Sequence, residues 1–313
     1  MKTLTMSTAV ALAFALPAFA ETDGFGPLLS PAELAQVLEA GDPLVLDIRP
    51  ADDEGYASGH LADAVSAPYG LFRGPEDNPG QLPLDADLTQ VLRGLGVRAD
   101  LPVVIVNQGK DATDFGAAAR VYWTLKSSGV QDLAILNGGV NAWTEAGYAL
   151  EKAPVAPQPS TIDVQFSHQW LATTEDVAAV VEGKDSALLL DARPESFWKG
   201  DQGHPAAAKP GTLPQSQYFT HSGWFSNGPA IVDAEAARRL AQENGLSESD
   251  QLISFCNTGH WAATNWFALS ELAGVENVKL YPDSMVGWSN AGYEMANVPG
   301  VFRNLWNQVT SVF

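Results

Sequence analysis

The sequence predicts an α/β protein of two tandem domains, each a mainly parallel sheet with helices on both faces. The chain has 313 residues, which is enough for two ordinary domains that each bury a core. Its second half repeats the first, and each half alternates short apolar runs with helical patterns. Alternation of this kind is typical of parallel sheets covered by helices.

The repeat consists of four short blocks that recur in the same order. The matched ranges are 45–50 with 189–194, 59–60 with 203–204, 104–107 with 253–256, and 143–148 with 288–293. The spacing is too long for a solenoid, so it indicates a duplicated domain. Residues 151–161 contain three prolines and are predicted to form an extended linker. We therefore expect one domain over residues 21–150 and another over residues 162–313.

Residues 1–20 are predicted to be a secretory signal peptide. Lys2 is followed by an apolar run and by an Ala-x-Ala end at Ala20, which is the pattern of a cleaved export signal. The apolar run is too short to span a bilayer. No later segment is long and apolar enough to span a membrane, so we expect a mature chain that is exported to a bacterial periplasm.

In the first domain, apolar runs rich in Val, Ile and Leu predict buried strands over residues 44–48, 103–107 and 133–136. Ser30, Pro31 and Glu33 are typical of a helix start, with an N-cap serine, a proline at the first position and a glutamate at the third. A further helix is expected over residues 115–125, with Gly129 as its stop.

The second domain shows the same order of elements. Strands are expected over residues 187–191, 252–256 and 278–281. Helices are expected over residues 173–181, 234–243 and 260–272, with Gly274 as the last stop.

The composition excludes several classes of protein. Lys and Arg number 17 against 37 Asp and Glu, a formal net charge of -20, so the chain lacks the clustered basic residues of a nucleic-acid binder. One cysteine excludes an internal disulfide, a CxxC redox pair and a multi-cysteine zinc site. With five scattered histidines, we expect no metal and no cofactor.

The single cysteine, Cys256, ends a predicted strand and is followed by a short loop and a helix. In open α/β sheets, ligands bind beyond the carboxyl ends of strands. A tight strand-to-helix loop also directs backbone N–H groups and the positive end of a helix at one spot, which stabilises a thiolate, a persulfide or a bound oxyanion. The alternative is a buried structural cysteine, but Gly259 and the strand–loop–helix context favour a reactive thiol.

Both halves of the chain resemble the rhodanese domain, and the sequence after residue 27 resembles a tandem-domain sulfurtransferase of the thiosulfate sulfurtransferase type. The resemblance rests on residues 47–49, 59–60, 136–143 and 146–148 in the first half, and on 191–193, 203–204, 256–262, 288 and 291–293 in the second. It implies that a Cys256 thiolate attacks the sulfane sulfur of a small donor such as thiosulfate. The sulfur stays as a persulfide and then passes to a thiol or cyanide acceptor, which is covalent catalysis in two steps.

The resemblance also implies roles for the residues near the cysteine. Backbone amides of the loop would hold the transferred sulfur; the candidates are Asn257, Thr258, Gly259, His260, Trp261 and Ala262. In the first domain Asn107 stands where the second has Cys256, so the first domain cannot form a persulfide. We expect this domain to contribute stability and no chemistry of its own.

The loop lacks the basic residue that many thiosulfate enzymes of the family carry there. It offers only His260, which could contact the donor anion, donate a proton to the leaving group, or face the solvent at the start of a helix. Lys199 and Lys209 could supply local positive charge, or they could be ordinary surface lysines. Trp261 could form a wall of the pocket.

Residues that recur in the first domain without the cysteine are interpreted as structural. Asp191 and Arg193 recur as Asp47 and Arg49, which predicts an ion pair at the end of a strand. The same reasoning applies to His204, which recurs as His60. Trp143, Trp266 and Trp288 are expected in the core.

A cysteine phosphatase and a non-catalytic sulfur carrier are the alternatives to a sulfurtransferase. A cysteine phosphatase needs an arginine six residues after the cysteine to bind phosphate with two parallel hydrogen bonds, and that residue is Ala262, so the class is excluded. The remaining alternative to an enzyme is a non-catalytic persulfide carrier or sulfur-binding module that hands sulfur to a protein partner.

Overall fold

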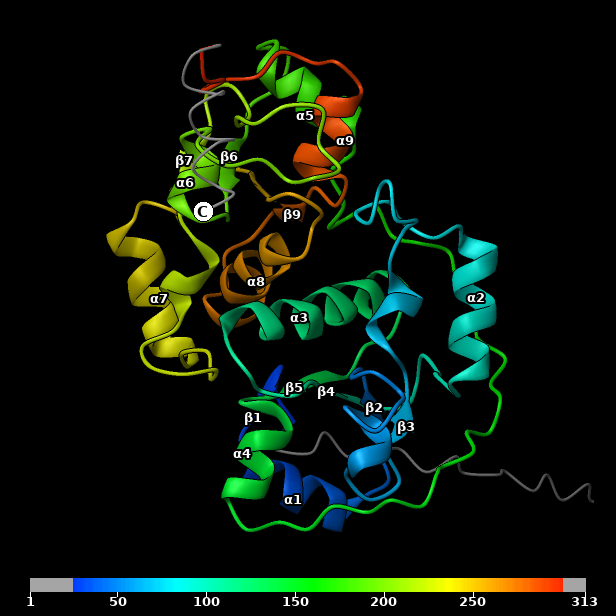
Figure 1. Ribbon diagram of the computed structural model, residues 1–313. Coiled ribbons are helices and arrows are strands. Elements are labelled where there is room, and N and C mark those ends of the chain that lie inside the picture. Colours follow the sequence, from blue (N-terminus) through cyan, green and yellow to red (C-terminus); the bar gives the residue numbers. More distant parts are fainter. Residues whose placement is uncertain (1–24, 301–313) are drawn as a thin grey trace, which may run out of the picture.

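The computed structural model describes residues 25–300 and contains two parallel sheets, one in each half of the chain (Figure 1). The predicted signal peptide, residues 1–20, lies outside the described residues. The predicted class, two α/β domains in tandem, is confirmed. Within residues 25–300 no helix has the length and apolar character needed to cross a membrane.

The first sheet has five parallel strands in the order β1-β5-β4-β2-β3. Their bounds are β1 Leu28–Leu29, β2 Leu44–Asp47, β3 Val65–Ser66, β4 Val103–Val106 and β5 Leu133–Leu136. The three predicted strands are present, each within one residue of its expected end. The edge strands β1 and β3 were not predicted, because two residues are too few to show an apolar pattern.

Helices of the first domain lie on both faces of its sheet (Figure 1). They are α1 Pro31–Ala40, α2 Asp85–Gly94, α3 Ala112–Ser127 and α4 Gly139–Glu145, with short 3₁₀ turns η1 Tyr56–Ser58 and η2 Tyr69–Phe72. Ser30 and Glu33 form a capping box at the start of α1, as predicted: each side chain accepts a hydrogen bond from the backbone N–H of the other residue. The helix α3 is longer than the expected 115–125, because Asp111 caps it by accepting from the Asp114 N–H.

The second sheet has four parallel strands in the order β7-β6-β8-β9. Its elements are β6 Leu188–Asp191, β7 Gln217–Tyr218, β8 Leu252–Phe255, β9 Val278–Leu280, α5 Thr174–Val181, α6 Glu195–Trp198, η3 His221–Trp224, α7 Ala234–Glu243, α8 Trp261–Phe267 and α9 Ser284–Asn290. The predicted helix over 260–272 is α8, which continues into a π-helical turn η4 over Ala268–Leu272.

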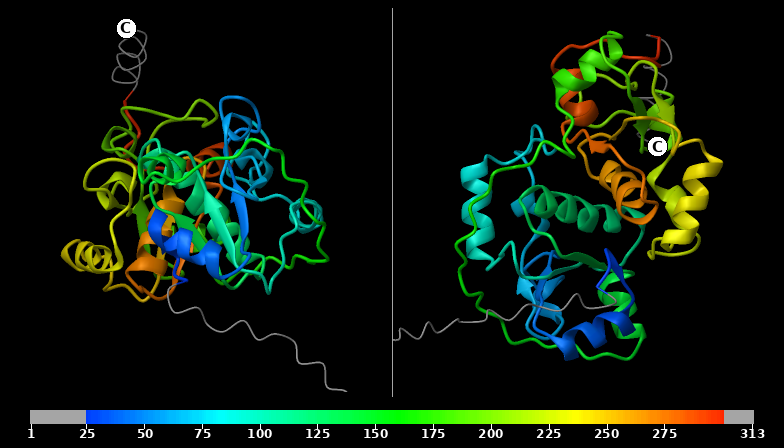
Figure 2. Two further views of the ribbon diagram at one scale, coloured as in Figure 1. Left: turned by 90° about the horizontal axis from the view of Figure 1, so that it is seen from below. Right: turned by 180° about the vertical axis from the view of Figure 1, so that it is seen from behind.

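The two domains share a hydrophobic core. In β4, Val104 and Val106 face an outer core of the first domain, whereas Val103 and Ile105 face a central cluster. That central cluster continues into the second domain through α8. The corresponding helices of the repeat, α3 and α8, pack against each other between the two sheets (Figure 2). The interface between the domains therefore consists largely of buried apolar side chains, and it includes helix α8.

Candidate active site

Cys256 lies directly after β8, at the carboxyl end of the second sheet. Side chains of β8 alternate, so that Ile253 and Phe255 face the outer core while Leu252 and Cys256 belong to the central cluster between the domains. The cysteine is 0% exposed. The Cys256 thiol therefore has no direct contact with solvent.

Ser284, at the start of α9, fixes the inner side of the loop after Cys256. Its hydroxyl accepts the N–H groups of Cys256 at 3.0 Å and Gly259 at 3.2 Å, and donates to the Tyr281 carbonyl at 2.7 Å. One donor and two acceptor positions are all that a hydroxyl offers, so Ser284 is fully used. Gly259 has a φ of +66°, and a Cβ there would collide with Arg120 and Pro282, which accounts for glycine at this position.

Three amides of the loop have no acceptor within the protein. The N–H groups of Asn257, Thr258 and His260 donate no hydrogen bond to any group in residues 25–300, although Asn257 and Thr258 are buried. Buried amides without a partner are rare. These three N–H groups are therefore available to an anionic group in the loop.

The first domain holds the outer side of the same loop. Arg73 donates to the Thr258 carbonyl at 2.9 Å, and Arg120 of α3 donates to the Gly259 carbonyl at 3.3 Å. The first domain is expected to contribute stability and no chemistry of its own, and this stays a prediction. It contacts the loop after Cys256 directly and helps to set its conformation.

His260 also belongs to this contact between the domains. One ring nitrogen, Nε2, is 2.7 Å from the Thr113 carbonyl, and the other, Nδ1, is 2.9 Å from the Tyr69 hydroxyl. A neutral ring fits both, with Nε2–H donating and Nδ1 accepting. Burial, together with the nearby Arg73, lowers the pKa of His260 to about 3. The ring thus faces the first domain, rather than the solvent or a donor, and carries no charge at neutral pH.

The other predicted neighbours of the loop lie in different surroundings. Trp261 stacks on His221 with ring centroids 4.9 Å apart and donates to the Thr113 hydroxyl, so it forms part of the domain boundary. Ala262 is buried, and its carbonyl accepts from Ser254. Lys199 is an exposed residue paired with Glu195 at 2.9 Å, and Lys209 is exposed; neither is shown in contact with the loop.

Positive charge at the loop comes instead from Arg73 and Arg120, which sequence reasoning missed. Neither forms an ion pair with a carboxylate within residues 25–300. Burial, with the nearby charge of Arg73, lowers the pKa of Arg120 to about 10, so it stays protonated at neutral pH. Negative charge at Cys256 raises the pKa of both Arg120 and Tyr69. An arginine within the apolar stretch 117–121 was the signal that could have indicated Arg120.

The repeated Asp–Arg motif is structural, as predicted. Arg193 and Asp191 form a buried ion pair at 2.6 Å, and Arg49 and Asp47 form the same pair at 2.6 Å. Arg193 also donates to the Asn257 side chain at 3.2 Å, which ties the pair to the loop.

The repeated histidine differs between the domains. His60 is fully buried and stacked on Tyr56, whereas His204 is partly exposed. The core position predicted for Trp143, Trp266 and Trp288 is confirmed.

The matching loop of the first domain is filled by a carboxylate. Asp114 Oδ2 accepts the Asn107 side-chain amide at 2.9 Å, the Gly109 N–H at 2.6 Å and the Lys110 N–H at 3.0 Å. Counting from Asn107 and Cys256, the counterpart of Asp114 in the second domain is Ala263. The same strand-to-helix loop thus holds an internal anion in one domain and leaves amides open in the other.

Within residues 25–300 no three His, Cys, Asp or Glu side chains gather as metal ligands would. The site consists of one thiol, three unpaired amides and two arginines. Amides and arginines stabilise negative charge, so these groups suit a cysteine that carries an anionic group. The family of rhodanese-like domains matches residues 30–146 and 173–291. The chain belongs to this family and is a tandem-domain sulfurtransferase.

Particular relatives agree with this assignment. A putative thiosulfate sulfurtransferase, SseB, of Mycobacterium tuberculosis is 29% identical over 273 residues, which are 84% of this chain and 94% of the relative. A probable 3-mercaptopyruvate sulfurtransferase of Pseudomonas aeruginosa is 31% identical, over 83% and 94% of the two chains. The structure of an anaerobic ergothioneine biosynthesis enzyme from Chlorobium limicola has a TM-score of 0.76 at 18% identity, over 89% of this chain and 72% of the other, and shows the likeness of fold.

Proposed function

We propose that Cys256 is the residue that carries sulfur, and that its donor is a small anionic sulfane compound such as thiosulfate. The Cys256 thiolate attacks the outer sulfur of thiosulfate, a new S–S bond forms, and sulfite leaves with the electron pair of the broken bond. An acceptor thiolate or cyanide then attacks the outer sulfur of the persulfide, and the thiolate of Cys256 leaves.

The observation that carries the proposal is that the two corresponding loops differ in one respect: the first binds a carboxylate of its own chain and the second does not. The amides of Gly109 and Lys110 bind the Asp114 carboxylate, which supports the view that this type of loop binds anions. The loop after Cys256 lacks such a carboxylate, and its Asn257, Thr258 and His260 amides are open. A persulfide anion on Cys256 would accept the hydrogen bonds that these amides donate, and the positive charge of Arg120 would interact with it favourably.

The experiment is to incubate the chain with thiosulfate and to measure its intact mass without reductant. We expect the gain of one sulfur, lost on addition of cyanide, and no gain in a Cys256→Ser chain. Because Cys256 is the only cysteine, a gain of sulfur in the Cys256→Ser chain would overturn the proposal, as would an unchanged mass of the wild-type chain.

A non-catalytic sulfur carrier is the second candidate. It is favoured by the complete burial of the Cys256 thiol, since a buried persulfide is protected from small acceptors. A protein called sulfur carrier protein TtuD, from Thermus thermophilus, is 24% identical over 66% of this chain and 74% of that protein. Multiple turnover with thiosulfate and cyanide indicates the enzyme; one sulfur bound without turnover indicates the carrier.

We also propose that residues 1–20 direct export to a periplasm. The supporting observation is their basic start, apolar run and Ala-x-Ala end. Expression of the whole chain in a Gram-negative host, followed by fractionation and N-terminal sequencing, tests it. We expect a periplasmic protein that begins at Glu21; a cytoplasmic chain that retains Met1 would contradict export.

A further inference from the structure

Arg120, on the first-domain helix α3, is a fully buried arginine that contacts both domains. Its Nη1 group donates to the Gly259 carbonyl at 3.3 Å, in the loop after Cys256, and its Nη2 group donates to the Gly80 carbonyl of the first domain at 3.1 Å. The guanidinium also lies over the Trp123 ring, 5.1 Å from its centroid. One side chain thus links the loop after Cys256 to the first domain.

The guanidinium of Arg120 has no counter-ion in the described part of the chain. Its Nε group is buried without a hydrogen-bond partner, and no carboxylate within residues 25–300 forms an ion pair with it. Asp283 instead accepts from the Asn78 side chain at 3.0 Å. Arginine is almost never fully buried unless its charge is paired, because a buried ion loses its hydration. The arrangement therefore indicates an anion that is present in only one state of the protein.

Among the groups that shift the pKa of Arg120, Cys256 is the one whose charge changes when sulfur is bound. Burial, and next the positive charge of Arg73, lowers the pKa of Arg120, whereas negative charge at Cys256 raises it. Negative charge at Tyr69 or Asp283 would act in the same direction as that at Cys256. Burial raises the pKa of Tyr69, however, so its hydroxyl is neutral at neutral pH, and the charge of Asp283 does not depend on sulfur. A persulfide is a stronger acid than a thiol, so sulfur bound to Cys256 brings a negative charge.

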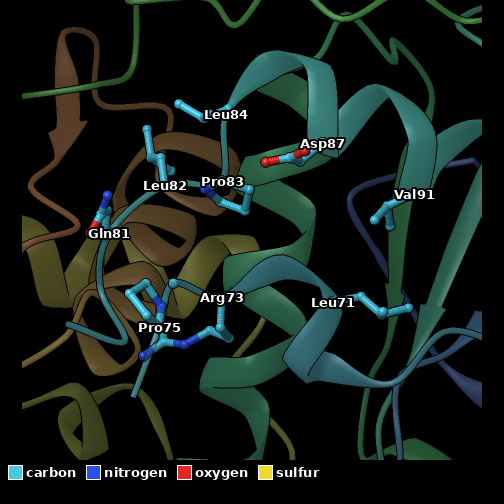
Figure 3. A pocket seen from close by; sticks show the side chains of 10 residues that line it. Leu71, Arg73, Pro75, Gln81, Leu82, Pro83, Leu84, Asp87 and Val91 are labelled. Atoms are coloured by element: carbon cyan, nitrogen blue, oxygen red, sulfur yellow. The ribbon is translucent and has the colours of Figure 1, made fainter. Parts of the chain in front are cut away.

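The first-domain segment 73–81, which accepts from Arg120 at Gly80, packs against the second domain (Figure 3). The approach is close, because a Cβ at Gly80 would collide with the Pro282 carbonyl, in the turn that precedes α9. An attraction between Arg120 and a charge on Cys256 therefore acts on a contact between the two domains.

We propose that Arg120 is the counter-charge of the anionic sulfur that Cys256 carries, and that loading Cys256 with sulfur therefore strengthens the contact between the two domains. The inference rests on the proposed function of Cys256. Arg120 acts through its charge and through the Gly259 carbonyl, so it is a positioning residue. The first domain, which has Asn107 in place of the cysteine, thus supplies a charge to the sulfur site of the second.

The test measures the melting temperature of the whole chain before and after loading with thiosulfate, while intact mass confirms one added sulfur. We expect loading to raise the melting temperature of the wild-type chain by about 2 to 4 °C, the scale of one charge-assisted contact in a chain of this size. In Arg120→Met, which removes the charge and keeps an apolar side chain, the rise should be at most half as large. A merely structural role would lower both forms alike and leave the rise unchanged.

Two further variants complete this test. Arg120→Lys keeps the charge and should retain most of the rise. Arg93→Met is the matched control, because Arg93 is an exposed first-domain arginine that donates to the Ile162 carbonyl; it should show the full rise. A rise in Arg120→Met equal to that of the wild-type chain would overturn the proposal, and so would a loaded wild-type chain that melts no higher than the unloaded one.

If the wild-type chain takes up no sulfur, the proposed function of Cys256 fails, and the charge pair is then tested without sulfur. Cys256→Asp and Cys256→Asn chains differ in charge at this one position. The melting temperature of the Asp variant relative to the Asn variant should be higher with Arg120 than in an Arg120→Met background. The same difference in both backgrounds would overturn the role of Arg120 as a counter-charge.

Discussion

The two strand-to-helix loops of the molecule, residues 107–111 and 256–260, follow corresponding strands and are anchored alike at their first residue. In the first, the N–H of Val140 donates to the Asn107 carbonyl at 3.0 Å; in the second, the N–H of Met285 donates to the Cys256 carbonyl at 3.1 Å. Each loop ends at the residue that precedes the corresponding helix, α3 or α8. The duplicated scaffold therefore anchors the starts of the two loops alike. Their backbones then differ, because the residue with positive φ is Gly109 in the first loop and Gly259, one position later, in the second. Their side chains differ as well.

Two substitutions separate the loops chemically. Asp114 fills the first loop with a carboxylate, whereas the second has Ala263 at that position. Gly139 lies so close to the first loop that a Cβ would collide with Asn107 and Gly109, whereas Ser284 inserts a hydroxyl into the second. The comparison shows that backbone amides of the first loop bind an internal carboxylate, and that the second loop has no carboxylate at the corresponding position.

The largest effect is expected from a substitution that gives the second loop the carboxylate of the first. We expect Ala263→Asp to place an anion against the loop amides and to reduce the rate of persulfide formation on Cys256 roughly 100-fold, the scale of losing preorganised backbone donors. Mass spectrometry over time after addition of thiosulfate measures this rate. Ala263→Asn is the matched control without charge, and a folded Ala263→Asp chain that reacts at the wild-type rate would contradict the expectation.

The reverse substitution removes the carboxylate from the first loop. Asp114→Ala removes the acceptor of three N–H groups, so we expect the free energy of unfolding to fall by about 2 to 3 kcal/mol. Urea denaturation measures it. Lys110→Ala, a change at an exposed side chain in the same loop, should cost much less, and equal losses for the two variants would contradict a specific role of the carboxylate.

A smaller change makes the second loop resemble the first at Ser284. Ser284→Gly removes the hydroxyl that accepts from Cys256 and Gly259, and glycine tolerates the φ of +49° found at this position. We expect persulfide formation to slow about tenfold, as for the loss of a single positioning hydrogen bond. A rate equal to that of the wild-type chain would mean that the loop keeps its shape without the hydroxyl.

The remaining prediction concerns pH. Burial lowers the pKa of His260 to about 3 from an ordinary value of 6.5. Between these values the unfolded chain binds a proton at this site and the folded chain does not, so acid favours unfolding. Stability should fall as pH drops below 6.5, by up to about 1.4 kcal/mol per pH unit from this one group.

The matched variant for this pH effect is His260→Gln, which keeps one donor and one acceptor without a titrating ring. Its free energy of unfolding should fall less steeply between pH 6.5 and pH 4.5 than that of the wild-type chain. Identical slopes in urea denaturation series would contradict a neutral, buried His260.

Much of the fold was predictable, because buried parallel strands and capped helices leave local patterns. The strands β2, β4, β5, β6, β8 and β9, the capping box of α1 and the place of Cys256 followed from such patterns. Edge strands of two residues left none, so β1, β3 and β7 were missed. The role of Asp114 also could not be read from sequence, since it depends on a side chain folding back onto its own loop.

Arg73, Arg120 and Thr113 were missed for a different reason. They lie far from Cys256 in the sequence, and only the packing of α3 against α8 brings them to the loop. The repeat indicated two similar domains but not which faces meet. The partners of His260, Tyr69 and Thr113, could not be named from the sequence for the same reason, because they belong to the other domain.

The central claim is that the first loop is closed by its own carboxylate while the second is open until sulfur arrives. Amide ¹H–¹⁵N NMR of the chain before and after loading with thiosulfate tests this claim most directly. We predict that the amide protons of Asn257, Thr258 and His260 shift downfield on loading, while those of Gly109 and Lys110 stay unchanged. Unaltered resonances of the second loop in a chain whose mass has risen by one sulfur would contradict the account.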